Sequence, residues 1–448
     1  MLISEKRATF SLSLVYALRM MGLFMILPVF SLYADQFGDT TPVLTGLAIG
    51  IYGLTQGLFQ LPFGFMSDRF GRKKIIVIGL LIFCAGSIVA AEADSIYQII
   101  GGRALQGLGA IAAAVMALAA DLTREEVRMR IMAFIGMSIG VSFMLSMVLG
   151  PVLAASYGLA SLFWITAGLA LLGILVIVFI TPQPLNQSFH RDTQLSLKDV
   201  GLILRNTELQ KLNVGIFVLH LVLAATFVIF PLVLRDSLQV DQALHWKMYL
   251  PVFVISVLFM VPMIITAEKF SQTKRVYVLA IVLLMLAEVG LAFGNSYVLA
   301  FGMMVLFFTG FNFLEASLPS LVSCLAPADM KGTAMGIFAS SQFLGAFCGG
   351  LTGGLLLANN SYTHAFLVLV AVIGLWLVVA MTMQPPKPLR SKIVSLKGLE
   401  NGELDLFLER AKLVEGVREV SVYVEDQIAY LKVEKTFDEQ ALNGLLAR

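Results

Sequence analysis

The stretch Gly64-Phe65-Met66-Ser67-Asp68-Arg69-Phe70-Gly71-Arg72-Lys73-Lys74 is the part of the chain that decides its fold. It lies between two apolar runs, 43–65 and 75–93, and each of them is long enough to cross a bilayer as a helix. So short a turn must join two antiparallel helices at one face of a membrane. One acidic and four basic residues stand within it. Because charges are expensive in lipid, we expect these side chains to act at the helix ends.

The composition of the whole chain also indicates an integral membrane protein. Of its 448 residues, 58% are hydrophobic and only 13% are charged, whereas soluble domains are roughly 45–50% apolar and roughly 25% charged. The net charge of +2, without a basic tract, gives no sign of a nucleic-acid partner. Cys84, Cys324 and Cys348 lie inside apolar runs, so we expect them to be unpaired core residues.

Apolar runs of membrane-spanning length recur about twelve times. They lie at 10–33, 43–65, 75–93, 97–120, 131–156, 161–181, 212–234, 248–267, 275–294, 298–325, 332–358 and 363–383. The first run is too long for a signal peptide, so we predict a retained first span. Basic residues gather in every second connection between the spans. The remaining connections contain only two basic residues, Arg235 and Lys247. Because basic loops stay in the cytoplasm, we predict that both termini are cytoplasmic.

The polar stretch 182–211 divides the spans into two halves, 1–181 and 212–383. The halves resemble each other at a shift near 200 residues, since Asp68-Arg69-Phe70 corresponds to Glu268-Lys269-Phe270. Duplicated halves are typical of transporters that rock around a site near the midplane, although a channel or a membrane enzyme could also be duplicated. We therefore predict an all-α membrane protein with twelve helices in two pseudo-symmetric six-helix halves.

After residue 383 the composition becomes that of a soluble domain. A stiff linker, 384–389, leads into 390–448, where strand and helix patterns follow one another in the order βαββα. This order predicts a small α+β, ferredoxin-like domain without the usual last strand. The domain contains no cysteine or histidine, which excludes metal carriage by a Cys-x-x-Cys loop. Regulation, self-association and binding of a small ligand stay open for this tail.

Two motifs in the first half resemble those of the major facilitator superfamily. The opening stretch matches the family signature Gly-x-Leu-a-Asp-Arg-x-Gly-Arg-Lys at Gly64, Asp68, Arg69, Gly71, Arg72 and Lys73. A second pattern, Arg-x-x-Gln-Gly-x-Gly-Ala, matches at Arg103, Gln106, Gly107, Gly109 and Ala110. The resemblance covers residues 1–383 and is of the drug/proton antiporter type. The antiporter motif Gly-Pro-x-x-Gly-Gly is half kept in Gly150-Pro151-Val152-Leu153-Ala154-Ala155, which leaves that subclass open.

The resemblance implies that the opening stretch is a conformational latch. Asp68 would face the N-terminus of the eleventh helix, near Gly332, where free backbone N–H groups favour an anion, and would hold the outward-facing state. Arg72 would pair with Asp121 at the end of the fourth span. The bases also satisfy the positive-inside rule, and that rule alone would place them here. The remaining members of the candidate latch are Gly64, Arg69, Gly71 and Lys73.

Five ionisable residues lie within the spans and are candidates for proton coupling or substrate contact. They are Arg19, Arg103, His220, Glu288 and Glu315. Such residues are costly in lipid and mark functional sites, and an isolated buried carboxyl or imidazole can exchange protons near neutral pH. The alternatives are a snorkelling arginine, a protonated acid bonded between helices, and a structural histidine.

Small residues and proline within the spans are expected at packing and hinge positions, because they let helices approach closely or bend. The positions are Gly107, Gly150, Pro151, Gly349 and Gly353.

We predict a secondary active transporter that exports a small amphipathic or drug-like molecule against proton entry. A proton-coupled symporter of a metabolite and a membrane receptor that signals through 390–448 are the alternatives. An enzyme is not expected, because the chain has no Walker sequence, metal-ligand cluster or catalytic triad pattern. No cofactor or metal is expected; the partners are the substrate, protons and the bilayer. We expect a monomeric membrane part in the inner membrane of a bacterium.

Overall fold

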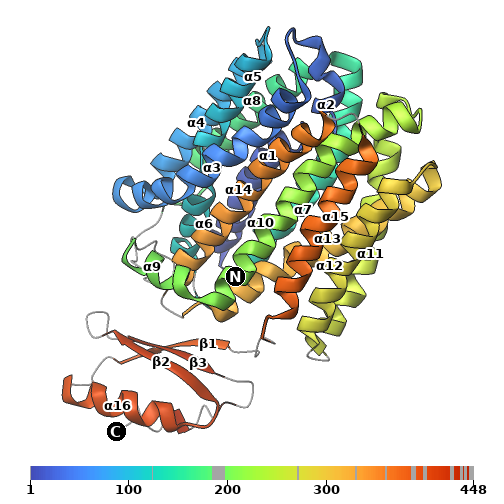
Figure 1. Cartoon of the computed structure of the whole chain (residues 1–448). Helices are drawn as coiled ribbons and strands as arrows, with labels where there is room; N and C mark the ends of the chain where they lie inside the picture. The colour runs from blue at the N-terminus through green and yellow to red at the C-terminus, as the bar shows by residue number, and fades with distance from the viewer. Residues whose placement is uncertain are drawn as a thin grey trace.

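The structure is a computed structural model, and it shows a bundle of long helices with a small sheet-containing tail (Figure 1). It describes residues 2–123, 125–183, 197–269, 272–327, 330–358, 361–384, 390–396, 401–423, 428–433, 437 and 441–442.

The first half of the bundle is built from residues before 181. Its helices are α1 (Ile3–Phe24), α2 (Phe30–Tyr33), η1 (Ala34–Gln36), α3 (Pro42–Phe70), α4 (Arg72–Ala91), α5 (Ile96–Leu108), α6 (Ala112–Asp121), α7 (Glu125–Tyr157), α8 (Leu159–Leu175) and η2 (Val176–Ile180). The predicted first span, 10–33, is divided after Phe24, and the predicted fourth span is divided at Gly109–Ile111. These two breaks correct the prediction of continuous helices there.

The second half follows a short amphipathic helix, α9 (Leu197–Arg205). Its helices are α10 (Thr207–Leu232), η4 (Val233–Ser237), η5 (Gln242–Leu244), α11 (Trp246–Lys269), α12 (Thr273–Phe293), α13 (Tyr297–Leu325), α14 (Lys331–Leu357) and α15 (Tyr362–Met381). The Asn206 side chain caps α10 by accepting from the N–H groups of Glu208 and Leu209. The helix therefore starts five residues before the predicted boundary at 212.

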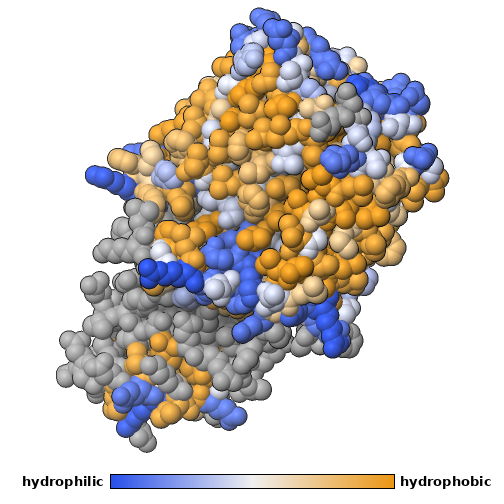
Figure 2. All heavy atoms as spheres, in the orientation of Figure 1, coloured by the Kyte–Doolittle hydropathy of each residue, from blue (hydrophilic) through white to orange (hydrophobic). Residues whose placement is uncertain are grey.

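Eleven helices or helix pairs among the described residues are long and apolar enough to cross a membrane. The first helix, α1, has 22 residues but carries several charges and falls outside this set, so the count of twelve stays a prediction. Figure 2 shows apolar side chains over the flank of the bundle and polar ones gathered at its two ends. This distribution is the one that a lipid belt requires.

The two halves meet along α3 and α14, and α14 also packs against α10. Further contacts between the halves join α7 to α11 and η5, and α10 to α2. Figure 1 places the N-terminus at the end of the bundle from which the tail leaves.

The tail contains a three-stranded antiparallel sheet of order β1-β3-β2, formed by β1 (Arg390–Ser395), β2 (Val417–Tyr423) and β3 (Ile428–Val433). One helix, α16 (Asn401–Leu413), lies between β1 and β2 in sequence and contacts β2. Phe407 and Ala411 of α16 join Val420 and Leu431 in a small apolar core. The predicted second helix, 437–446, lies largely outside the described residues.

Candidate functional site

The opening stretch is mostly helical, which corrects its prediction as a turn. α3 continues to Phe70, and α4 starts at Arg72, so Gly71 alone separates the two helices. Gly71 has a φ of 99°, in the left-handed region that favours glycine. The tight break brings Asp68 and Arg72 together, and Arg72 Nη1 donates hydrogen bonds to Asp68 Oδ1 and, at 3.0 Å, to Ser67 Oγ.

Arg72 also reaches the end of the fourth span. Its Nε donates to Asp121 Oδ2 at 3.1 Å, so the structure brings Arg72 and Asp121 together, while their role in a latch stays a prediction. Among the described residues, the hydrogen bonds of Asp68 lead to Arg72 and not to α14. The predicted contact of Asp68 with the eleventh helix therefore stays a prediction. Arg69 is exposed and lies against the ring of Phe70.

A seam of glycines joins α3 to α14 at the end of the bundle away from Gly71. A Cβ atom added at Gly46 would lie 2.2 Å from Gly350 O, and one added at Gly50 would lie 2.6 Å from Phe347 O. One added at Gly53 would lie 2.4 Å from Phe343 O. The two backbones approach this closely only because side chains are missing, and we call these contacts the glycine seam.

The predicted packing glycines lie in contacts of the same kind. Added Cβ atoms would lie 2.4 Å from Tyr52 O at Gly107, 2.4 Å from Met25 O at Gly150, 2.1 Å from Leu221 O at Gly349, and 2.9 Å from Val228 Cβ at Gly353. These glycines therefore lie where helices approach closely, and their role in packing stays a prediction. Pro151 lies inside α7, which continues through it to Tyr157.

Arg19 is buried in the first half, where the broken fourth span provides a partner for it. Its Nη2 donates to Gly109 O at 3.0 Å, to Tyr52 Oη at 2.9 Å and to Gln56 Oε1 at 2.6 Å. Gly109 lies at the interruption between α5 and α6. Only 1% of Arg19 is exposed, and its Nε and Nη1 have no hydrogen-bond partner in the part of the chain that the structure describes. The irregular backbone is thus tolerated because it binds a buried cation.

Arg103 lies over the ring of Tyr52, whereas Arg19 bonds to the Tyr52 hydroxyl. Its guanidinium is 5.0 Å from the centre of the Tyr52 ring, and its Nη1 donates to Gln106 Oε1 at 2.8 Å. Longer bonds of 3.4 Å lead to the carbonyls of Ala48 and Ile49. With 1% exposure, Arg103 is not the snorkelling side chain that the sequence left open.

A second cluster lies in the other half, and it joins His220 of α10 to Glu315 of α13. Gln342 of α14 stands between them, with its Nε2 3.0 Å from Glu315 Oε1 and 2.8 Å from His220 Nε2. His220 Nε2 is 3.7 Å from Glu315 Oε2. The expectation of an isolated, buried Glu315 is wrong, because its side chain is 37% accessible and has two polar neighbours. Helix packing brings these neighbours from other spans.

Glu288 matches the expectation of a buried acid. It is fully buried in α12, and its Oε1 accepts a hydrogen bond of 2.8 Å from Thr226 Oγ1 of α10. Its Oε2 has no hydrogen-bond partner within the described residues. Among the described residues, the acidic and basic side chains deep within the spans are therefore arginines in the first half and carboxylates with a histidine in the second.

An aromatic cluster packs the halves together between these groups. Phe143 of α7 contacts Phe24 at a ring distance of 5.0 Å, Phe253 at 5.6 Å, Phe308 at 5.8 Å and Phe227 at 6.4 Å. Two of these five rings lie in the first half and three lie in the second half. The cluster therefore contributes to closure of the bundle interior.

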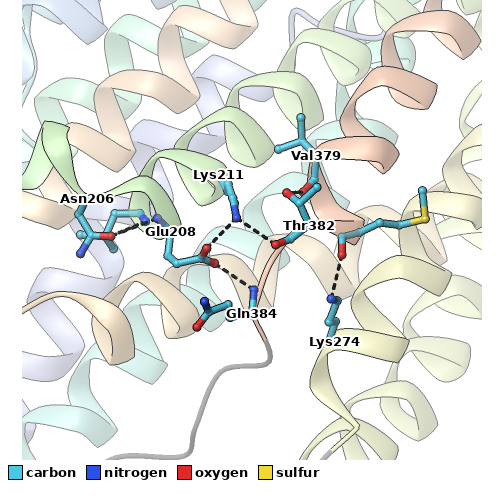
Figure 3. A network of polar contacts seen from close by, with 9 residues as sticks. Asn206, Glu208, Lys211, Lys274, Val379, Thr382 and Gln384 are labelled. Carbon is cyan, nitrogen blue, oxygen red and sulfur yellow. Dashed lines mark hydrogen bonds and ion pairs between the residues drawn. The ribbon is translucent and has the colours of Figure 1, made fainter.

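Basic side chains hold the last helix of each half by its terminal carbonyls. In the first half, Arg7 donates to Phe179 O at 3.1 Å and Lys73 donates to Thr181 O at 2.5 Å. In the second half, Lys211 donates to Thr382 O at 3.0 Å and Lys274 donates to Met381 O at 2.8 Å (Figure 3). Cations suit the negative end of a helix dipole. Lys73 thus has a structural role that the sequence did not indicate.

In the second half, a further residue, Glu208, joins these contacts at the end of α15 and holds the start of the tail. Glu208 accepts from Lys211 Nζ at 2.7 Å and from the backbone N–H of Gln384 at 3.1 Å (Figure 3). The chain leaving α15 is therefore fixed to the first turn of α10.

Several residues of these clusters, among them Tyr52, Gln56 and Gln342, were not predicted from the sequence. Tyr52, Gln56 and Gln60 recur every four residues in an apolar run, which is the signal of a polar stripe on one helix face. Gln342 follows two serines in the eleventh run, which is a weaker signal. No group of three His, Cys, Asp or Glu side chains that could hold a metal lies within the described part of the chain.

A bundle of spanning helices in two halves, with charged clusters inside and a seam of glycines between the halves, defines a polytopic membrane transporter. The family model of the Major Facilitator Superfamily matches residues 12–263 and 212–424. The chain belongs to the Major Facilitator Superfamily, and it is a transporter rather than an enzyme.

Individual relatives agree with this assignment. The chain is 44% identical over 434 residues to the inner membrane transport protein YajR of Escherichia coli (strain K12), covering 96% of this chain and 94% of that protein. It is 27% identical over 350 residues to the multidrug resistance protein MdtH of Aeromonas hydrophila, covering 77% and 86%. The crystal structure of a bacterial homologue of the human lysosomal transporter Spinster has the same fold, with a TM-score of 0.68 at 14% identity, covering 86% and 98%.

Proposed function

We propose that this transporter exports a small amphipathic molecule by alternating access, driven by protons that enter through the second half. The observation that carries the proposal is the cluster of His220, Glu315 and Gln342. A carboxylate and an imidazole 3.7 Å apart in the middle of a membrane protein can exchange a proton, and partial exposure of Glu315 gives that proton a route. The similarity to a multidrug resistance protein supports an amphipathic substrate.

The contacts between the halves support an inward-facing state of this structure. The glycine seam, the contacts of α7 with η5 and those of α10 with α2 all lie at the end away from Gly71. At the opposite end, the described bonds of Asp68 lead to Arg72. In the proposed cycle, the outward-facing state opens the glycine seam and moves Asp68 to the N-terminus of α14. The proposed latch also contains residues that set its shape or pair with its charges: Gly64, Arg69, Gly71 and Asp121.

The proposed topology places both termini in the cytoplasm of a bacterial inner membrane, with a monomeric membrane part. The halves are 1–181 and 212–383, joined by 182–211. We also propose that 390–448 is a ferredoxin-like domain, which the antiparallel order β1-β3-β2 supports. A receptor that signals through this domain is the alternative; deletion of 390–448 would leave flux intact in a transporter and remove the output of a receptor.

The proposed function is tested in proteoliposomes with the amphipathic dye Hoechst 33342 as the probe. An acidic lumen is expected to accelerate dye accumulation, because protons leaving the lumen drive the dye inward. Glu315→Gln is expected to abolish this acceleration, and Ser341→Ala serves as the control. Dye flux that is indifferent to the pH gradient would refute proton coupling, and a gradient effect of opposite sign would indicate symport.

A further inference from the structure

The side chain of Gln342 is a double donor in the cluster of the second half. One amide N–H points to Glu315 Oε1 at 3.0 Å and the other to His220 Nε2 at 2.8 Å. The other ring nitrogen of His220, Nδ1, lies 3.3 Å from Ile216 O and can only donate there. The arrangement is therefore self-consistent for neutral His220, with its proton on Nδ1, and ionised Glu315.

A proton taken up by His220 Nε2 makes the arrangement impossible. If the proton binds His220 Nε2, that atom becomes a donor and can no longer accept from Gln342. It would instead donate to Glu315 Oε2, which is 3.7 Å away and has no hydrogen-bond partner among the described residues. A proton on Glu315 Oε2 alone leaves the bond from Gln342 to Oε1 in place, because the other oxygen of a protonated carboxyl still accepts. Protonation of His220 thus requires a new position of the Gln342 amide, with its oxygen toward the imidazolium.

The same turn of α14 touches the first half. Ser340 Oγ donates to Gly57 O of α3 at 3.0 Å. Phe343 packs edge-on against Tyr52 with ring centres 6.4 Å apart, and its carbonyl lies at Gly53 in the glycine seam. Residues 340–343 therefore face the proton-binding cluster on one side and α3 on the other.

Tyr52 extends this line of contacts to the arginines. Its hydroxyl accepts from Arg19, and its ring lies under Arg103. The titratable and charged groups around Gln342 are His220 from α10, Glu315 from α13, Tyr52 from α3, and Tyr16 and Arg19 from α1, where Tyr16 lies within electrostatic range of Glu315. These groups come from both halves, so a change in proton occupancy in one half acts on charges in the other.

We propose that Gln342 is the positioning residue that couples proton occupancy of the His220–Glu315 pair to the contact between α14 and α3. While the pair is deprotonated, the Gln342 amide ties α14 to α10 and α13, and α14 holds α3. A proton on His220 releases the amide from the imidazole, and α14 is then free to separate from α3. This inference rests on the proposed proton coupling and adds the residue that transmits it.

The test measures a distance across the bundle end near Gly71 as a function of pH. Spin labels are placed at Lys74→Cys and Arg275→Cys, two exposed residues at the starts of α4 and α12. The full chain, with its three cysteines replaced by alanine, is studied in lipid nanodiscs. Gln342→Met keeps the length of the side chain and removes both donors, and Gln342→Glu replaces the donor by an acceptor. Ser341→Ala is the matched control, because its hydroxyl donates within α14 to Ile337 O.

The wild-type protein is expected to change its distance distribution with pH. In Gln342→Met the midpoint of this change is expected to move up by about one pH unit, because the lost amide bonds favour the deprotonated pair. Gln342→Glu is expected to move the midpoint further in the same direction, and it keeps the test valid if the methionine variant fails to fold. The Ser341→Ala midpoint is expected to match that of the wild type.

Two other outcomes would overturn the proposal in different ways. If the wild type responds to pH and both Gln342 variants follow it with the same midpoint, Gln342 does not transmit proton occupancy, while proton coupling stands. If the wild type and Glu315→Gln show the same distances at every pH, the proposed proton coupling itself fails, and the role of Gln342 fails with it.

Discussion

Replacement of Gly350 by alanine is expected to open the glycine seam. The new Cβ atom would lie 2.6 Å from Gly46 O and 2.8 Å from Gly50 Cα, whereas ordinary contact begins at 3.4 Å. The two helices must therefore separate locally by about 0.8 Å, the difference between 3.4 and 2.6 Å. Both clashing atoms belong to the backbone of α3, so no side chain can turn away to relieve them.

Overpacking of this kind costs about 1–3 kcal/mol, and only a state with a closed seam bears that cost. The ratio of seam-open to seam-closed molecules should thus rise by about 5- to 150-fold. Spin labels at Asp94→Cys and Asn295→Cys, two exposed positions at the same end of the bundle, report the separation of the halves. Gly350→Ala is expected to lengthen this distance.

The matched control is Gly302→Ala in α13, where an added Cβ atom meets nothing within 4 Å. Alanine favours a helix by roughly 1 kcal/mol over glycine in either state, and the control contains this effect without the clash. An unchanged distance distribution in Gly350→Ala would show that the seam does not determine which end is closed.

Three further predictions follow from the clusters. Asp68→Asn removes one of two carboxylates from Arg72 and the anion proposed to cap α14, so the distance between labels at Lys74→Cys and Arg275→Cys should shift to the inward-facing value; an unaltered distance would refute the latch. Arg19→Met leaves three acceptors without their donor and is expected to lower the free energy of unfolding by about 3 kcal/mol or more, measured by thermal unfolding in detergent; an unchanged melting temperature would contradict the network. Glu288→Gln keeps an acceptor for Thr226 and should leave the pH dependence of dye transport unchanged; a lost pH dependence would make Glu288 the proton carrier.

The spans and the halves could be predicted because lipid imposes a simple rule on the sequence. A helix must be about 20 apolar residues long to cross the bilayer, and basic loops mark one side. The pair of Arg72 and Asp121 was also predictable, since it follows from the family motif. The interruption at Gly109 was not, because its freed carbonyl is stabilised by Arg19, a residue 90 positions away.

The role of Gln342 depends on packing that no local pattern contains. Its partners lie 122 and 27 residues away on two other helices. For the same reason Glu315 was predicted as an isolated acid, although packing of α13 against α10 and α14 gives it two neighbours. The extent of the opening stretch was mispredicted because a single glycine with a positive φ can end one helix and begin another without a loop.

The most direct test of proton-driven alternating access is a pair of distances measured in the same nanodisc preparation over a range of pH. One pair of labels, Lys74→Cys with Arg275→Cys, reports the end near Gly71, and the other, Asp94→Cys with Asn295→Cys, reports the end at the glycine seam. The two distances are expected to change in opposite directions as the pH changes, and Glu315→Gln is expected to hold both constant. Distances that change together, or that change equally in Glu315→Gln, would contradict the account.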